Sequence, residues 1–203
     1  MIHAYHATFG TYGSWLPNDP RGSASRFVGS RKLYQHGGRS DPSKRIKYDD
    51  LPSHEQRKYT VIQSQLLREA VVFNEAHLKE MAIAFEQFIA DHRLQVWAAA
   101  ILACHVHLVF ARCGRKAELL IDELKVFCHE RIVSLGISPL GCSSKNSVWA
   151  EGRWIVFLDK GEAIESAIAY VVQNPIEEGG KPQVWPFVVP FRGVESNIVS
   201  YRD

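Results

Sequence analysis

The sequence predicts an α+β sandwich, a fold in which helices pack against an antiparallel sheet. Short apolar runs suited to strands alternate with longer segments whose apolar residues recur every three to four positions, as in amphipathic helices. Two of the apolar runs are separated only by residues 102–104, a spacing that favours a β-hairpin. The 203 residues fit one domain, and 46% hydrophobic residues is enough for an ordinary globular core.

Strands and helices are expected in an interspersed order. Strands are predicted at residues 2–9, 94–101, 105–111 and 154–158, with a short extended piece at 70–73. Helices are predicted at 53–67 with Ser53 as N-cap, at 74–92 with Asn74 as N-cap, at 116–135 and at 161–174. The last helix is expected to stop before Pro175, because proline cannot continue the backbone hydrogen-bond ladder.

A long segment without periodicity, residues 10–52, interrupts this pattern. It is rich in glycine, proline and serine, and loops of this length are usually functional or disordered. Between Arg21 and Lys47 a single acid, Asp41, stands against a basic set: Arg21, Arg26, Arg31, Lys32, Arg39, Lys44, Arg45 and Lys47. The segment is either a contact surface for a polyanion or a solvated, mobile loop.

Nothing in the composition indicates a secreted or membrane protein. The first residues lack the basic and apolar regions of a secretory signal, and no uncharged apolar stretch reaches the ~18 residues of a membrane span. The four cysteines form no Cys-x-x-Cys pair and are expected to be reduced, which favours a cytoplasmic location of the bacterial type. The formal net charge of +2 is too small to establish nucleic-acid binding.

The most informative pattern is His105-Val106-His107, within the apolar run 97–110. Two side chains two residues apart on a strand project from the same face of a sheet. Neutral imidazole is a common ligand of divalent cations, so His105 and His107 are candidate metal ligands. The alternative is a pair of hydrogen-bonded, partly exposed histidines on an edge strand.

A second pattern lies on the predicted last helix. Tyr170 and Asn174 are four residues apart and share one helix face. The amide oxygen of asparagine suits Mg²⁺ or Mn²⁺, and a tyrosine one turn away can reach a phosphate bound to that cation. The alternative is that Tyr170 is a core aromatic residue and that Asn174 merely ends the helix.

Taken in this order, the two patterns resemble the single-tyrosine HUH transposases, in particular the REP-associated tyrosine transposases. The likeness runs from about residue 5 to residue 179 and includes the first strand, the hairpin of residues 97–110, and residues 149–154. It implies a ferredoxin-like α+β sandwich with a central antiparallel sheet. It also implies a divalent metal, Mg²⁺ or Mn²⁺, bound by His105, His107 and Asn174, with Tyr170 as catalytic nucleophile and Lys125 as a DNA contact.

The activity implied by the resemblance is that of a transposase, a single-strand endonuclease and DNA strand transferase. Tyr170 would attack a backbone phosphate of single-stranded DNA and form a 5′-phosphotyrosine link, and rejoining would need no ATP. The partner would be single-stranded DNA carrying a hairpin, and a homodimer is possible because some relatives exchange the tyrosine helix. Candidate contacts in the basic loop are Arg26, Arg31, Lys32 and Arg39, with Phe27 and Tyr34 available for stacking.

The resemblance divides the chain into a catalytic domain, residues 1–180, and an extended tail, residues 181–203. Two departures stand out: residues 102–104 replace the usual proline and small polar residue, and residues 176–179 lack the usual basic residue. Two other interpretations remain open. One is a zinc site formed by Cys104, His105, His107 and Cys113, and the other is a catalytically inactive protein that binds a DNA hairpin.

Overall fold

The computed structural model describes residues 1–16, 50–139 and 141–194. The predicted order of elements is confirmed within these ranges. The elements are β1 (Ala4–Gly10), α2 (Ser53–Ser64), α3 (Glu75–Asp91), β2 (Val96–Ile101), β3 (His105–Ala111), α4 (Ala117–Ser134), β4 (Trp154–Leu158) and α5 (Gly161–Glu177).

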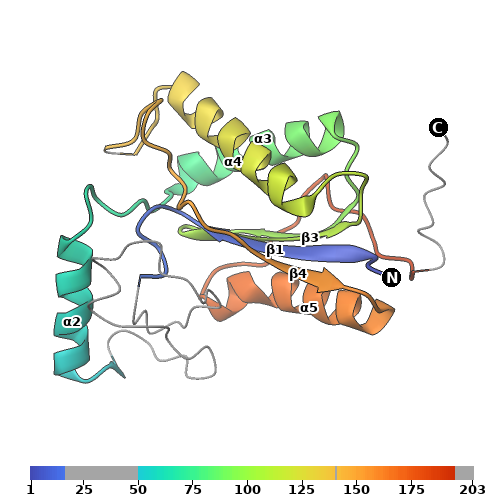
Figure 1. The fold of residues 1–203 in the computed structure, drawn as a ribbon, viewed down its shortest axis with the longest axis horizontal. Coiled ribbons are helices and arrows are strands. Elements are labelled where there is room, and N and C mark those ends of the chain that lie inside the picture. The colour runs from blue at the N-terminus through green and yellow to red at the C-terminus, as the bar shows by residue number, and fades with distance from the viewer. Residues whose placement is uncertain (17–49, 140, 195–203) are drawn as a thin grey trace.

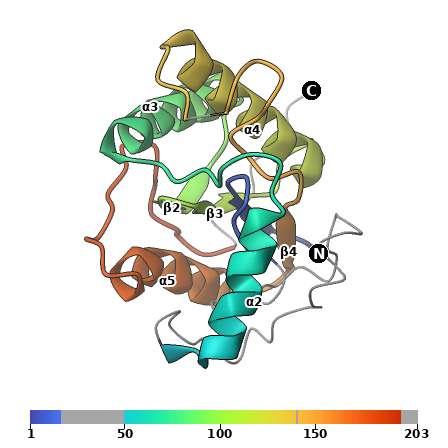
Figure 2. The same cartoon turned by 90° about the vertical axis from the view of Figure 1, so that its left-hand side faces the viewer.

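The strands form one sheet in the order β2-β3-β1-β4, and each neighbouring pair is antiparallel. Helices α3 and α4 cover one face of this sheet and α5 covers the other (Figures 1 and 2). The connection order β1-α3-β2-β3-α4-β4 is that of a ferredoxin-like fold. The predicted α+β sandwich with a central antiparallel sheet is therefore confirmed, and its helices cover both faces of the sheet.

The alternation of side chains along β1 and β3 separates the two faces of the sheet. One set packs with α3 and α4 in the main core: Tyr5, Ala7, Phe9, Val106, Leu108 and Phe110. The residues between them face α5, where Ala4 and Val109 join Ile164, Ala167 and Val171 in a second, smaller core. Helix α5 contacts β2 and β3 more than β4.

The end of α5 differs from its prediction. The helix passes through Pro175 and ends at Glu177, because Asn174 and Pro175 are both buried and their packing outweighs the hydrogen bond that proline cannot make. Gly179 then adopts a left-handed conformation with φ of 80°. Its N–H donates to the Ile176 carbonyl at 2.9 Å, and the Gly180 N–H donates to the Pro175 carbonyl at 2.8 Å. This is a Schellman motif, which stops the helix at a defined residue.

The other helix boundaries follow local side-chain chemistry. Asn74 caps α3 as predicted: its side chain accepts from the His77 N–H at 3.0 Å, and the His77 ring accepts from the Asn74 N–H at 3.1 Å. The predicted N-cap at Ser53 is wrong by one residue, since Pro52 occupies that position and makes no side-chain cap. Residues 70–73 are not part of the sheet, although Val71 N–H donates to the Tyr12 carbonyl.

Beyond α5, residues 181–189 run along the outer edge of β2. The Gln183 side chain donates to the Ile101 carbonyl and accepts from its N–H, at 2.8 and 2.9 Å. The Val189 N–H donates to the Val96 carbonyl at 2.9 Å. The predicted boundary at residue 180 stays a prediction. No helix within the described ranges combines the length and the hydrophobicity that crossing a bilayer requires.

Candidate active site

His105 and His107 lie on β3 and face α5, as the strand alternation predicts. Their rings are 5.0 Å apart between centroids and nearly perpendicular. Both residues are buried, with 2% and 5% of their surface exposed. Two imidazoles at this depth require polar partners, because a buried polar group without a hydrogen bond is costly.

Helix α5 brings the amide and the phenol to these rings. Asn174 is 3% exposed, and its Oδ1 lies 3.4 Å from His105 Nε2. One helical turn earlier, the half-buried Tyr170 ring lies 5.3 Å from the His107 ring, edge to face. The structure therefore gathers the sequence-predicted set of His105, His107, Tyr170 and Asn174 at one place between β3 and α5.

Strand β1 adds two residues that the sequence interpretation did not select. Thr8 is paired with His107 in the sheet, and its Oγ1 lies 3.0 Å from His107 Nδ1. His6 Nε2 lies 3.2 Å from the same nitrogen, and the His6 ring is 5.8 Å from the Tyr170 ring. The available signal was the placement of His6 and Thr8 at alternate positions of an otherwise apolar strand.

The environment of His6 keeps it neutral. Burial lowers the pKa of His6 from 6.5 to about 4, since desolvation disfavours the imidazolium. With Thr8 and His6 both at His107 Nδ1, the hydrogen bond at that nitrogen fixes the ring orientation. In such an arrangement the opposite nitrogen, Nε2, is the one suited to coordinate a cation.

Two further residues, Glu178 and Trp15, lie beside His105. Glu178, directly after α5, places Oε1 3.6 Å from His105 Nε2. The Trp15 ring lies 4.9 Å from the His105 ring, with its backbone in the left-handed region at φ of 48°. Gly10 is opposite His105 in the sheet, and a Cβ there would lie 3.0 Å from the Trp15 ring. Glycine at position 10 therefore leaves the room that Trp15 occupies.

The donor atoms around His105 suit a divalent cation. Within the described ranges, no three side chains of His, Cys, Asp or Glu form a group able to hold a metal ion, so a cation here would depend on the Asn174 amide. Ligands bonded at about 2.1 Å lie about 3.0 Å apart at octahedral angles and about 3.4 Å apart at tetrahedral angles. The 3.4 Å between His105 Nε2 and Asn174 Oδ1 equals the tetrahedral spacing and is about 0.4 Å longer than the octahedral spacing that Mg²⁺ requires.

The cysteines do not complete a zinc site with these histidines. Cys104 Sγ lies 3.5 Å from His105 Nδ1, but Cys113 packs against the core on the α3 and α4 face of the sheet. The four residues of that alternative are thus divided between the two sides of the sheet.

Lys125 is not part of this arrangement. It lies on α4, and its Nζ donates to the carbonyls of Ala150, Glu151 and Gly152 at 2.6, 3.2 and 3.3 Å. Burial lowers the pKa of this amino group. The structure therefore gives Lys125 backbone partners in the loop before β4, and its DNA contact stays a prediction. Arg26, Arg31, Lys32, Arg39, Phe27 and Tyr34 lie outside the described residues.

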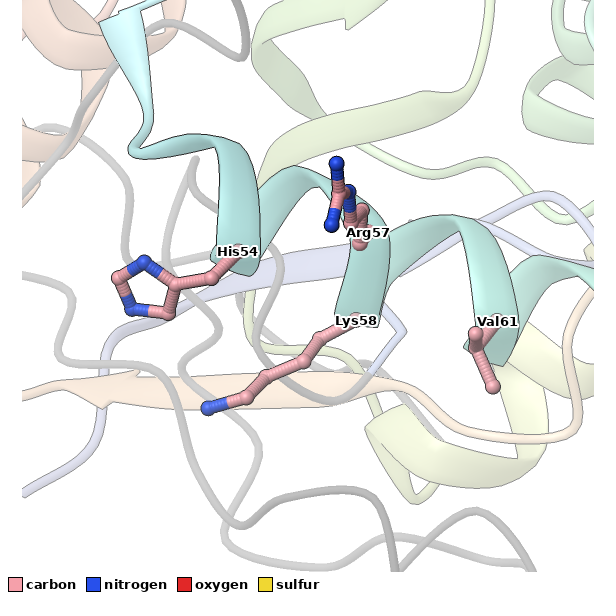
Figure 3. Close-up of a pocket in the computed structure, with 4 residues that line it drawn as sticks. All are labelled: His54, Arg57, Lys58 and Val61. Atoms are coloured by element: carbon pink, nitrogen blue, oxygen red, sulfur yellow. The ribbon is translucent and has the colours of Figure 1, made fainter.

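A separate hollow lies on the surface of α2. It is lined by His54, Arg57, Lys58 and Val61, and none of the residues around the histidine pair contributes to it (Figure 3). His54, Arg57 and Lys58 are exposed. The sequence interpretation did not select this basic surface.

Comparison with known proteins gives a structural likeness but no sequence match. No protein-family profile matches the sequence, and no curated protein matches it. Among solved structures, the chain is similar to "Structure of the REP associates tyrosine transposase bound to a REP hairpin", at 16% identity and a TM-score of 0.44. The similarity covers 92% of this chain and 76% of that one. These values are too low to establish a common family, so the site is interpreted from its own residues.

Proposed function

We propose that this protein cleaves and rejoins single-stranded DNA, with Tyr170 as nucleophile and a divalent cation held by His105, His107 and Asn174. The observation that supports this function most is the convergence of two buried imidazoles, one amide oxygen and one phenol. These groups come from β3 and α5, and the four lie together only because α5 packs across the sheet at this point.

Each residue has a defined part in this chemistry. His105, His107 and Asn174 would hold Mg²⁺ or Mn²⁺, which polarises the phosphate and stabilises the charge that develops on it. The Tyr170 oxygen attacks the phosphorus and loses its proton, so a phosphorus–oxygen bond to Tyr170 forms. The bond to the 3′-oxygen breaks, and that oxygen leaves as a 3′-hydroxyl. Attack by a 3′-hydroxyl reverses the step and needs no external energy source, because the phosphodiester is conserved.

The choice of substrate comes from the family resemblance. Single-strand transferases of that family select their site through a DNA hairpin, and we propose a hairpin with a single-stranded flank as the partner of this chain. The exposed bases of such a flank can reach a nucleophile that is only half buried, as Tyr170 is.

The test is covalent attachment to labelled DNA. A library of hairpin oligonucleotides, labelled at the 3′ or the 5′ end, is incubated with the full chain and Mn²⁺, and adducts are resolved after denaturation. The wild type is expected to retain the label on the 3′ side of the cut, and Tyr170→Phe or EDTA is expected to abolish the adduct.

Tyr59→Phe is the matched control, because Tyr59 lies on α2 and packs with Leu16 and Ile62 in a separate small core. Equal adduct formation by wild type and Tyr170→Phe would show that the nucleophile is another residue. Tight binding of a hairpin without any adduct would instead indicate the alternative function, an inactive hairpin-binding protein.

A further inference from the structure

Two tryptophans that the proposed function does not use lie on the α5 side of the sheet, next to the histidine pair. The Trp15 ring lies 4.9 Å from the His105 ring, and Trp154, the first residue of β4, is paired with Thr8. We propose that Trp15 and Trp154 stack on unpaired bases of the DNA, one on each side of the phosphate that is cut. This inference rests on the proposed function, since it names how the same site holds its single strand.

The register of the sheet places Trp154 beside the site. Thr8 is paired with His107 on one side and with Trp154 on the other, so these three residues form one row across the sheet. Residues paired directly in antiparallel strands point to the same face, and neighbouring strands lie about 4.8 Å apart. Trp154 therefore faces the α5 side, with its backbone about 10 Å from that of His107.

Helix α5 leaves this part of the sheet open. It packs mainly on β2 and β3, whereas β4 is at the edge of the sheet. Trp154 and Val156, which the pairing directs to the α5 side, are each 39% exposed, although tryptophan is usually well buried. Val156 is paired with His6, whose ring lies 5.8 Å from the Tyr170 ring. A strand that reaches the phenol can therefore pass over the open face of β4.

The segment that carries Trp15 is fixed on both sides. Before it, the hydroxyl and the backbone N–H of Ser14 both donate to the Thr11 carbonyl, at 2.6 and 3.1 Å. After it, Leu16 is buried in a small core with α2. The φ of 48° at Trp15 is unfavourable for a bulky residue, and such backbone strain is typical of ligand-binding positions. The fold thus holds a half-buried indole at His105 in spite of this strain.

Stacking on an indole ring is the contact that unpaired bases favour. Every base has an aromatic face, so stacking contributes affinity whatever the sequence of the strand. A competing interpretation is that the two tryptophans serve only the packing of the protein. Packing requires an apolar side chain of suitable volume, whereas stacking requires an aromatic ring. Leucine and phenylalanine variants therefore distinguish the two interpretations.

The experiment measures the binding of the full chain to a fluorescent DNA hairpin by anisotropy, in EDTA so that no strand is cut. One probe carries an unpaired thymidine flank of about ten nucleotides at each end, and the other probe is blunt. Trp15→Leu and Trp154→Leu are each expected to raise the dissociation constant of the flanked hairpin about fivefold or more, and to leave that of the blunt hairpin unchanged. Trp15→Phe and Trp154→Phe keep an aromatic ring and are expected to stay within about twofold of the wild type.

Phe157→Leu is the matched control. Phe157 is 50% exposed on the same strand as Trp154, but it points to the opposite face, where its ring contacts Tyr5. This variant is expected to bind both probes like the wild type. Melting temperatures verify that each variant is folded.

Unchanged binding of the flanked hairpin by either tryptophan-to-leucine variant would overturn the inference. So would an equal loss for the blunt hairpin or for Phe157→Leu, or a wild type that binds the flanked probe no better than the blunt one. The proposed function would survive these results if the wild type still forms a Mn²⁺-dependent adduct that requires Tyr170. Conversely, binding of the flank that depends on both tryptophans, together with an adduct that Tyr170→Phe leaves intact, would support the inference and overturn the nucleophile.

Discussion

Successive residues of β1 and β3 point to opposite faces of the sheet, and the two faces differ in chemical character. Towards α3 and α4 the strands present aliphatic and aromatic side chains, which form the main core. Towards α5 the same strands present His6 and Thr8, which make polar contacts with His107, and His105, whose ring packs against that of His107. The comparison shows how one pair of strands provides stability and reactive groups at once.

The difference between the faces has an energetic reason. Burial of an imidazole ring contributes less favourable free energy than burial of a hydrocarbon side chain. Its desolvation cost is limited only if the ring forms hydrogen bonds. The apolar face does not need such partners, and it contributes the transfer free energy that keeps the strands paired. Substitutions on the apolar face should therefore change mainly stability, and those on the histidine face mainly chemistry.

The largest expected effect is on the apolar face. Phe110 is completely buried in the main core, and Phe110→Ala is expected to lower the free energy of unfolding by about 3–5 kcal/mol. The measurement is urea unfolding of both proteins. His107→Gln, on the same strand but the other face, is the control and should cost only about 1 kcal/mol. Equal losses of unfolding free energy in the two variants would contradict the conclusion that the apolar face contributes more to stability than the histidine face.

The second expected effect is a dependence of stability on pH, which arises from His6 on the histidine face. Since burial holds the pKa of His6 at about 4, against 6.5 in the unfolded chain, protons bind more tightly to the unfolded chain. Stability from neutral His6 is therefore fully present above pH 6.5 and is lost as the pH falls through about 4. The difference between the two pKa values corresponds to about 3 kcal/mol in the free energy of unfolding.

Urea unfolding between pH 7.5 and 4 measures this dependence. His6→Asn removes the titrating ring, and because both proteins share the same carboxylates, the difference between their profiles isolates His6. The wild-type profile should fall more steeply below pH 6.5, and parallel profiles would show that His6 is not the source.

Much of the fold and half of the site could be predicted from local sequence. The hairpin, the period-two pattern of β3 and the Asn74 cap depend on residues close together in the chain. The same holds for His105 with His107 and for Tyr170 with Asn174, since each pair belongs to one element whose geometry fixes the relative direction of its side chains.

The remaining site residues depend on contacts that local patterns do not contain. His6 and Thr8 reach His107 only through the register of β1 against β3, about one hundred positions apart in the chain. Glu178 reaches His105 only because α5 continues past Pro175, which local rules predict to end the helix. Lys125 lies among backbone carbonyls because α4 packs on the other face of the sheet.

A third prediction tests the glycine that faces His105. Gly10→Ala is expected to cost about 1–3 kcal/mol of stability, because the new methyl group overlaps Ser14 and the Trp15 ring, and displaces that ring from His105. The Trp15 environment can be followed by near-ultraviolet circular dichroism, and stability by urea unfolding. Gly152→Ala is the control, since a Cβ at position 152 meets no atom within 4 Å. Similar stability and similar circular dichroism for both variants would contradict the conclusion that Gly10 leaves room for the Trp15 ring.

The smallest change in stability is expected from Thr8→Val, which keeps the shape of the side chain and removes its hydroxyl. His107 Nδ1 then loses its contact to Thr8 at 3.0 Å and keeps its contact to His6 at 3.2 Å. Stability should fall by about 1 kcal/mol or less, whereas the dissociation constant for Mn²⁺ should rise about tenfold, as for other residues that orient a metal ligand. Thr60→Val on α2 provides the control. If Thr8→Val binds Mn²⁺ like the wild type, His6 alone orients His107, and the hydroxyl on β1 serves packing, like the apolar residues on the opposite face.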